Sequence, residues 1–129
     1  MSSWGFVFVL VAAAMTMGAN LMLRAGIDAA GGFSPGTALE LIFGLLRLFL
    51  QPLFAIGFVT YFLAAVVWFR VVATEPLSVA YPILVSLTFT FVTAGAVIVF
   101  QEPISLRKVL GLAVILAGIV ILSTEKGAT

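Results

Sequence analysis

The chain has 129 residues, of which 64% are hydrophobic and 9% charged, and its mean hydropathy is +1.32. Soluble domains are roughly 45–50% apolar and about 25% charged, so a soluble fold of this size would expose a large apolar surplus to water. The formal net charge of +1 gives no reason to expect a nucleic-acid partner. Because Cys and His are both absent, we expect no disulfide, no metal site, no cofactor and no enzyme activity.

This composition predicts an all-α integral membrane protein, a single domain over residues 1–129 with four transmembrane helices and one short interfacial helix. The first span is expected at about residues 4–24, because the apolar run from Trp4 to Leu23 is close to the ~20 residues that cross a bilayer. A cleaved signal peptide is the alternative, but no Lys or Arg precedes this run, which exceeds the ~7–15 apolar residues of a signal sequence. We expect Arg24 to mark the water boundary.

A loop rich in Gly, Ser and Pro is expected at residues 29–36, followed by a short amphipathic helix at about residues 38–50. Thr37 and Glu40 have the spacing of a capping box at the start of this helix. The segment is short and carries charges of both signs, so we expect it to lie along the membrane surface rather than to cross it. It ends before Pro52, since proline disfavours helix in the residue that precedes it.

The remaining spans are expected at about residues 52–72, 77–100 and 104–122, with breaks that contain proline between them. Trp68 is expected to anchor the second span at the interface, and Ser105 to cap the last one. The last span has the shortest uninterrupted apolar stretch, residues 109–122, behind two basic residues whose long side chains can reach the interface. Four spans place both termini on one side, and Lys and Arg are divided too evenly between the two sides to set the orientation.

The first span carries Thr16, Asn20 and Arg24 at i, i+4 and i+8, which places the three side chains on one helix face. Polar groups inside a span are costly, so this face marks a candidate substrate path. The alternative is that Thr16 and Asn20 form hydrogen bonds between helices while Arg24 reaches the lipid phosphates. Both interpretations remain open.

The third span carries Tyr81, Pro82 and Ser86, and a bend at Pro82 could shape a substrate pocket beside the other two. The alternative is structural, because proline is common in membrane helices and hydroxyl groups bond their own backbone. The five acidic residues all lie at predicted helix ends or in loops. We therefore expect no carboxylate where a proton relay at the bilayer centre would need one.

Small residues on the last span indicate close helix packing, within or between subunits. Gly111 and Gly118 lie seven residues apart, on one stripe of the predicted helix. One four-helix chain encloses little volume, so a central pathway needs a second copy or a partner. We expect a dimer whose two halves rock about a fixed site.

Four segments, residues 18–24, 76–83, 102–105 and 111–120, resemble the small multidrug resistance branch of the drug/metabolite transporter superfamily. The resemblance covers all four predicted spans and implies a transporter. The drug and guanidinium exporters of that family carry a proton-exchanging glutamate in the first helix and a tryptophan shortly after the tyrosine that Tyr81 matches. Met15 and Leu84 stand at those places here, which counts against proton-coupled drug antiport.

The chain is more similar to the paired subunits that move aminoarabinose-phosphoundecaprenol across the bacterial inner membrane. This resemblance implies a multi-pass inner-membrane flippase for a lipid-linked sugar, with Arg24 meeting the phosphate. It also implies membrane lipids as partners and a homodimer or a heterodimer with a similar small subunit, in an antiparallel arrangement. The alternatives are a small multidrug or small-cation exporter and a non-transporting membrane partner subunit.

Overall fold

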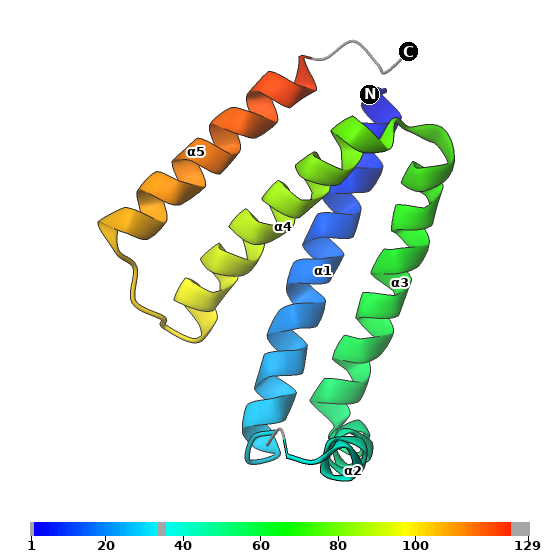
Figure 1. The fold of residues 1–129 in the computed structure, drawn as a ribbon, viewed down its shortest axis with the longest axis vertical. Coiled ribbons are helices and arrows are strands. Elements are labelled where there is room, and N and C mark those ends of the chain that lie inside the picture. The colour runs from blue at the N-terminus through cyan, green and yellow to red at the C-terminus, as the bar shows by residue number, and fades with distance from the viewer. Residues whose placement is uncertain (1, 34–35, 125–129) are drawn as a thin grey trace.

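The structure is a computed structural model that describes residues 2–33 and 36–124. All regular secondary structure in these residues is helical. The helices are α1 (Ser3–Ala29), α2 (Ala38–Phe49), α3 (Pro52–Thr74), α4 (Leu77–Val99) and α5 (Leu106–Ser123). The four long helices alternate in direction, so the start of α1 and the end of α5 lie at the same end of the molecule (Figure 1). The expectation of an all-α fold is confirmed.

Helix α1 extends beyond the predicted membrane span of residues 4–24. It includes Arg24 and continues to Ala29. Its start is capped by the Ser2 hydroxyl. Its end is set by Gly31 and Gly32, whose φ values of 91° and 104° lie in the left-handed region that favours glycine. The Gly32 N–H donates a 2.8 Å bond back into the last turn, which is the usual way for such a pair to close a helix.

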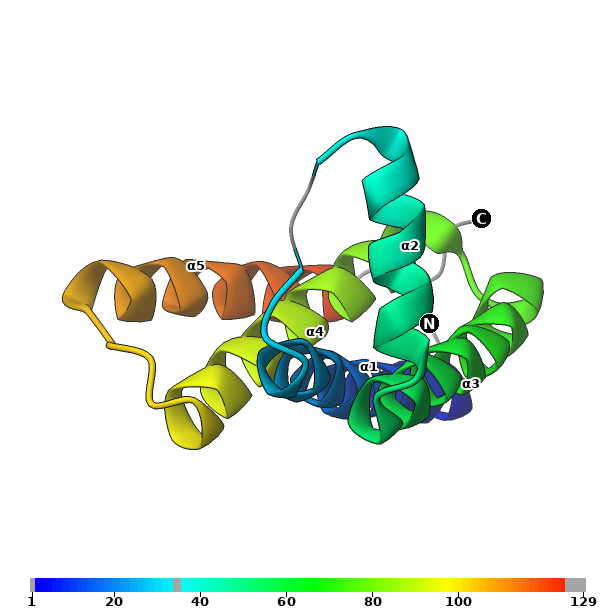
Figure 2. The ribbon, with the colours of Figure 1, turned by 90° about the horizontal axis from the view of Figure 1, so that it is seen from below.

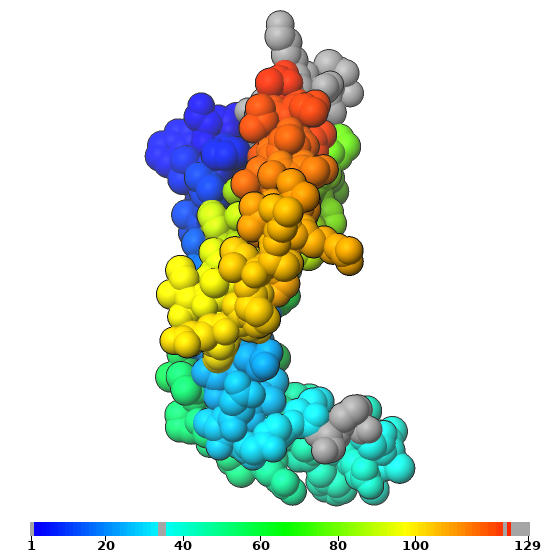
Figure 3. All heavy atoms as spheres, turned by 90° about the vertical axis from the view of Figure 1, so that its left-hand side faces the viewer, coloured from blue at the N-terminus to red at the C-terminus, as the bar shows by residue number. Residues whose placement is uncertain are grey.

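The short helix α2 lies at the end of the molecule where α1 ends and α3 begins, and it runs crosswise to α3, which it contacts (Figure 2 and Figure 3). Figure 1 shows it end-on, Figure 2 shows it lengthwise, and in Figure 3 it projects from the foot of the molecule. The predicted capping box is confirmed, since the Thr37 hydroxyl accepts from the Glu40 N–H and the Glu40 carboxylate accepts from the Thr37 N–H. Residues 34 and 35 of the preceding predicted loop lie outside the described residues.

The starts of the later helices follow local signals in the sequence. Pro52 is the first residue of α3, where its missing N–H would be unpaired in any case. The Ser105 hydroxyl caps α5 by accepting from the Lys108 N–H at 3.2 Å. Pro82 supplies no N–H to the carbonyl of Ser78, yet α4 continues through it to Val99.

Helices α1 and α3 approach closely because glycines face the contact. A methyl group on Gly26 would lie 2.6 Å from the backbone nitrogen of Phe54. A methyl group on Gly57 would lie 3.0 Å from the backbone nitrogen of Leu23. Small residues allow this packing in membrane helices, where van der Waals contact replaces the hydrophobic effect as the driving force.

The buried core gathers at the end of the molecule where α1 begins. Its members are Val9 and Ala13 of α1, Val71 of α3, Val79, Ala80, Ile83 and Leu87 of α4, and Ile119 of α5. Toward the other end, α4 and α5 diverge from α1 and α3 (Figure 1). Helices α4 and α5 therefore move away at that end, while α1 and α3 stay in contact there through Gly26 and Gly57 (Figure 1).

Many large apolar side chains remain uncovered, among them Phe62, Phe69 and Ile98. Lipid is the solvent that makes such a surface favourable. Among the described helices, α1, α3 and α4 are long and apolar enough to cross a membrane. The chain is therefore a multi-pass membrane protein.

Helix α5, the predicted fourth span, is not among those three. Its first turn carries Arg107 and Lys108, which leaves residues 109–122 as the apolar part. At 1.5 Å per residue this stretch is roughly 21 Å long, against the ~30 Å of a typical hydrocarbon core.

Candidate functional site

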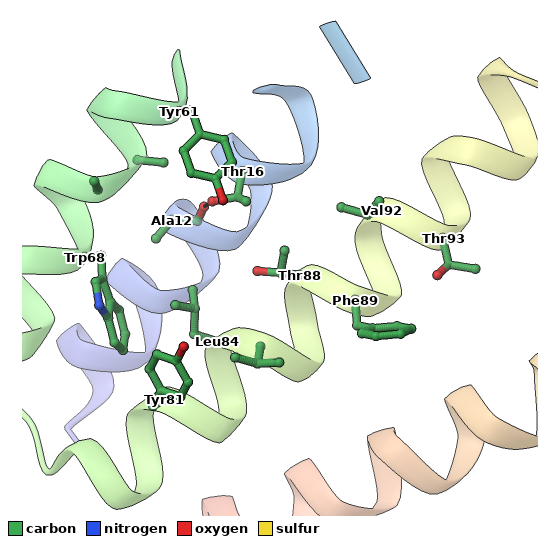
Figure 4. Close-up of a pocket in the computed structure, with 13 residues that line it drawn as sticks. Ala12, Thr16, Tyr61, Trp68, Tyr81, Leu84, Thr88, Phe89, Val92 and Thr93 are labelled. Carbon is green, nitrogen blue, oxygen red and sulfur yellow. Dashed lines mark hydrogen bonds between the residues drawn. The ribbon is translucent and has the colours of Figure 1, made fainter. Parts of the chain in front are cut away.

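Two neighbouring cavities lie along α4. The first, here called the aromatic cavity, has a volume of about 660 Å³ and lies between α1, α3 and α4 (Figure 4). Its lining includes Tyr61 and Trp68 of α3 and Tyr81 and Thr88 of α4, and no charged side chain is among the described residues that line it. Of these four, Tyr81 is the residue that the sequence predicts to bind substrate; it lines the cavity, and its role in binding stays a prediction.

Trp68 forms one wall of the aromatic cavity. Its ring centroid lies 5.8 Å from that of Tyr81, with the planes at 60°. Trp68 therefore packs against the next helix, and its position at the membrane interface stays a prediction. Leu84 of α4 also lines the cavity, whose indole comes from α3. Tyr61 and Trp68 are seven residues apart on one face of α3, a spacing that the sequence analysis did not use.

Hydroxyl groups supply the polarity of the aromatic cavity. The hydroxyls of Tyr81 and Thr88 point into it (Figure 4). The Thr16 hydroxyl donates to the Ala12 carbonyl of its own helix at 2.7 Å, so its proton is already used in a hydrogen bond. A cavity with aromatic walls, hydroxyls and no charge suits an uncharged ring or a weakly polar group.

The second, here called the charged cavity, has a volume of about 530 Å³ and lies between α1, α4 and α5. Its polar lining comprises Asn20 and Arg24 of α1, Thr93 of α4, Glu102 of the α4–α5 connection and Lys108 of α5. Phe89, Val92 and Thr93 of α4 line both cavities. The two cavities are therefore adjacent, and the charges gather at one end of the pair.

Arg24 of the charged cavity forms two ion pairs and one cation–π contact. Its guanidinium lies 3.4 Å from Asp28, one turn along α1, and 3.9 Å from the Glu102 carboxylate. The guanidinium carbon also lies 5.5 Å from the centre of the Phe100 ring, within cation–π range. Arg24 thus joins α1 to the connection between α4 and α5.

The predicted polar face of α1 is divided between the cavities. Thr16 lines the aromatic cavity, whereas Asn20 and Arg24 line the charged one. The hydrogen bonds expected between helices are not those observed, because the Asn20 side-chain amide donates to the Thr16 carbonyl of its own helix at 2.9 Å. The face therefore lines the two cavities and does not link α1 to another helix through Thr16 or Asn20.

Pro82 and Ser86 are not among the residues that line either cavity. The Ser86 carbonyl accepts the Thr90 hydroxyl at 2.9 Å within α4. Adjacent residues on a helix point about 100° apart, so Pro82 and Ser86 share a face that differs from that of Tyr81. The structure does not bring these two residues together with Tyr81 in a pocket.

The glycines of α5 do not serve packing within this chain. A methyl group on Gly111 or Gly118 would meet no described atom within 4 Å, although Gly111 lines the charged cavity. The close approach within the chain uses Gly26 and Gly57 instead, and packing of the α5 glycines between subunits stays a prediction.

The opposite end of the molecule is held by a contact between Ser2 and Glu75. The backbone N–H of Ser2 donates to the Glu75 carboxylate at 3.1 Å, and the Ser2 hydroxyl donates to it as well. The hydroxyl bond is the main reason why the pKa of Glu75 is below its usual value of 4.5. Within the described ranges, no group of three or more acidic residues is placed to hold a metal ion.

The chain is similar over part of its length to proteins named probable 4-amino-4-deoxy-L-arabinose-phosphoundecaprenol flippase subunit ArnE. The protein from Escherichia coli O81 (strain ED1a) is 50% identical over 62 residues, which are 48% of this chain and 55% of that protein. The one from Erwinia tasmaniensis is 47% identical over 62 residues, 48% of this chain and 56% of that protein. The one from Escherichia fergusonii is 45% identical over 69 residues, 54% of this chain and 61% of that protein.

The matched part of this chain thus spans a little more than half the length of each of these relatives. No solved structure matches the chain. Residues 8–123, which are most of the chain, match putative transmembrane family 234. The apolar helices are those expected of a transmembrane family, in agreement with this long match. The chain belongs to putative transmembrane family 234.

Proposed function

We propose that this chain is a subunit of a flippase that moves a lipid-linked sugar across the bacterial inner membrane. The observation that carries the proposal is the charged cavity directly beside an uncharged aromatic one along α4. A lipid-linked sugar has a related division, with an anionic phosphate next to a sugar ring, and an amine on that ring is a cation that the aromatic faces attract. The local identity to flippase subunits supports this substrate class.

The charged cavity takes the phosphate in this proposal. Arg24 and Lys108 supply two cations, and the planar guanidinium matches a phosphate through two parallel hydrogen bonds. The Lys108 ammonium donates to the Pro103 carbonyl at 2.8 Å, which holds it beside the α4–α5 connection. The Asn20 amide adds a polar group deeper along α1.

The aromatic cavity takes the sugar ring. Trp68 and Tyr81 offer flat apolar surfaces to the carbon–hydrogen faces of a sugar, and the Thr88 hydroxyl offers hydrogen bonds. The polyprenyl chain stays in the surrounding lipid, since α4 and α5 diverge from α1 and α3 at the end that carries the charges (Figure 1).

The membrane topology proposed here has four spans, α1, α3, α4 and α5, with α2 at the surface. One side of α2 is an exposed apolar face, formed by Leu39, Ile42, Phe43, Leu46 and Leu50. Glu40 and Arg47 lie away from that face, as in a helix that rests in the interface plane. Arg107 extends the short α5 by reaching the lipid phosphates.

A second small subunit completes the transport path. The outer face of α5 leaves Val114 and Ile121 more than two-thirds exposed, and the glycines at positions 111 and 118 allow another helix to approach. An antiparallel pair would form two halves related by an in-plane axis and would alternate access by rocking. That the relatives are named subunits supports an assembly of more than one chain.

Reconstituted transport tests the proposal. Proteoliposomes with this chain, alone or with a similar small subunit, should move the aminoarabinose-linked undecaprenyl phosphate without a pH gradient. Proton-driven efflux of a lipophilic cation instead would identify a small-cation exporter. If the chain only raises the level of a partner that transports alone, it is a non-transporting subunit.

A further inference from the structure

The cation assigned to the phosphate is already paired with an internal anion. The Glu102 carboxylate lies 3.9 Å from the Arg24 guanidinium, and both side chains line the charged cavity. Asp28 lies nearer, at 3.4 Å, but it is on the same helix as Arg24 and is not among the residues that line the cavity. Glu102 is therefore the carboxylate that meets Arg24 from the cavity.

The backbone before Glu102 is held in an unusual conformation. Gln101 has a φ of 52°, and it is the non-glycine residue with positive φ among the described positions. The N–H of Glu102 then donates back to the Ala96 carbonyl of α4 at 3.3 Å. Residues held in this way cluster at functional sites, and here the conformation directs Glu102 toward α1.

The pair joins α1 to the α4–α5 connection at the end where α4 diverges from α1, together with the contact of Arg24 on the Phe100 ring. The other end is secured by the buried core and by the bonds from Ser2 to Glu75. Arg24 and Glu102 are both substantially exposed, with 57% and 40% of their side chains accessible. Exposed ion pairs are weak, so a stronger anion can displace this carboxylate.

We propose that Glu102 is an internal competitor for the phosphate subsite and that it holds the mouth of the charged cavity closed until a phosphate displaces it from Arg24. This inference rests on the proposed function and adds a residue to it. Binding of the phosphate frees the α4–α5 connection from α1, so that recognition of the headgroup and opening of that end are one event. A neutral polyprenol cannot displace Glu102 and leaves the end closed.

Binding of undecaprenyl phosphate to the full chain in lipid nanodiscs tests the competition. Glu102→Gln should raise the affinity about two- to fivefold, the range expected when a weak exposed ion pair no longer has to be broken. Asp28→Asn is the matched control, since it neutralises a carboxylate that is nearer to Arg24 than Glu102 but is not among the residues lining the cavity. Arg24→Gln should lower the affinity at least about tenfold.

The outcomes separate the two proposals. If the wild-type chain binds and Glu102→Gln leaves the affinity unchanged or lower, Glu102 is not a competitor and the proposed function stands. Equal gains from Glu102→Gln and Asp28→Asn would mean general electrostatics and would also overturn the role of Glu102. A wild-type chain that does not prefer undecaprenyl phosphate to undecaprenol would overturn the proposed function, and this inference with it.

A distance measurement tests closure without any ligand. Because the chain has no cysteine, spin labels at Ala29→Cys and Ile104→Cys report only the separation of α1 from the α4–α5 connection. We expect Glu102→Gln to lengthen or broaden this distance in the absence of ligand, and undecaprenyl phosphate to do the same to the wild-type chain. Identical distance distributions in the wild type and Glu102→Gln would overturn the inference.

Discussion

The indole of Trp68 lies edge to face against the phenol of Tyr81, with ring centroids 5.8 Å apart. The contact joins α3 to α4 across a turn of two residues and sets the width of the aromatic cavity at its end nearest the core. A cavity whose walls are rigid rings loses little conformational freedom when a ligand binds. The Trp68–Tyr81 pair therefore prepares the site before the substrate arrives.

Replacing Trp68 by leucine should slow transport of the lipid-linked sugar about three- to tenfold, because an aromatic pair contributes roughly 0.5–1.5 kcal/mol beyond burial. Phe62→Leu is the matched control, an exposed aromatic residue on the same helix that does not line the cavity. Initial rates in proteoliposomes provide the measurement. Equal rates for the two variants would remove Trp68 from the site.

Gly26→Ala should destabilise the chain by about 1–3 kcal/mol, because the added methyl group would overlap the backbone of α3. Gly18→Ala on the same helix meets nothing within 4 Å and should be neutral or mildly stabilising, since alanine favours helix. Thermal unfolding in one detergent compares the two variants. A loss of stability in Gly18→Ala that equals that of Gly26→Ala would contradict the proposed contact between α1 and α3.

The Ser2–Glu75 contact should make stability depend on pH in the acid range. Folding lowers the pKa of Glu75, so the unfolded chain binds the proton more readily and the stabilisation is present at neutral pH. The stabilisation is lost as the pH falls below the usual 4.5 and through the lower folded pKa. The difference in stability between the wild type and Glu75→Gln should therefore shrink on acidification, and the Glu75 carboxyl should titrate below 4.5 by NMR. A midpoint at or above 4.5 would show that the contact does not form.

The apolar face of α2 should face lipid. Leu46→Cys and Arg47→Cys place single labels on neighbouring residues that point about 100° apart. Electron paramagnetic resonance should find the label at position 46 more accessible to oxygen and the label at position 47 more accessible to a water-soluble nickel reagent. Equal access of the nickel reagent to both labels would place α2 in water instead of in the interface.

Features that depend on neighbours in the sequence could be predicted. The capping box of Thr37 and Glu40, the proline start of α3 and the Ser105 cap are each set by residues within one helical turn, and all three are confirmed. The predicted span at residues 4–24 concerns the stretch inside the membrane, and a water boundary at Arg24 stays a prediction. In the structure the helix continues to the glycines at positions 31 and 32.

Features that join distant parts of the chain could not be predicted from one sequence. The pairing of Arg24 with Glu102 depends on the angle between α1 and α4. No local sequence pattern predicts this angle. Pro82 and Ser86 were chosen because they are near Tyr81 in the sequence, but nearness along a helix does not give a shared face. The position of Trp68 near the end of its span predicts an interface anchor, but it does not reveal the contact with Tyr81 of α4.

The most direct test of the central claim is the rate at which proteoliposomes translocate aminoarabinose-linked undecaprenyl phosphate with three forms of the chain: wild type, Arg24→Gln and Arg70→Gln. Arg70 is the matched control, an exposed arginine at the other end of the molecule that is bonded to Thr74 and lines neither cavity. The proposed phosphate subsite predicts translocation by the wild type and by Arg70→Gln, and a rate at least about tenfold lower for Arg24→Gln. No translocation by the wild type, or equal rates for the wild type and Arg24→Gln, would contradict it.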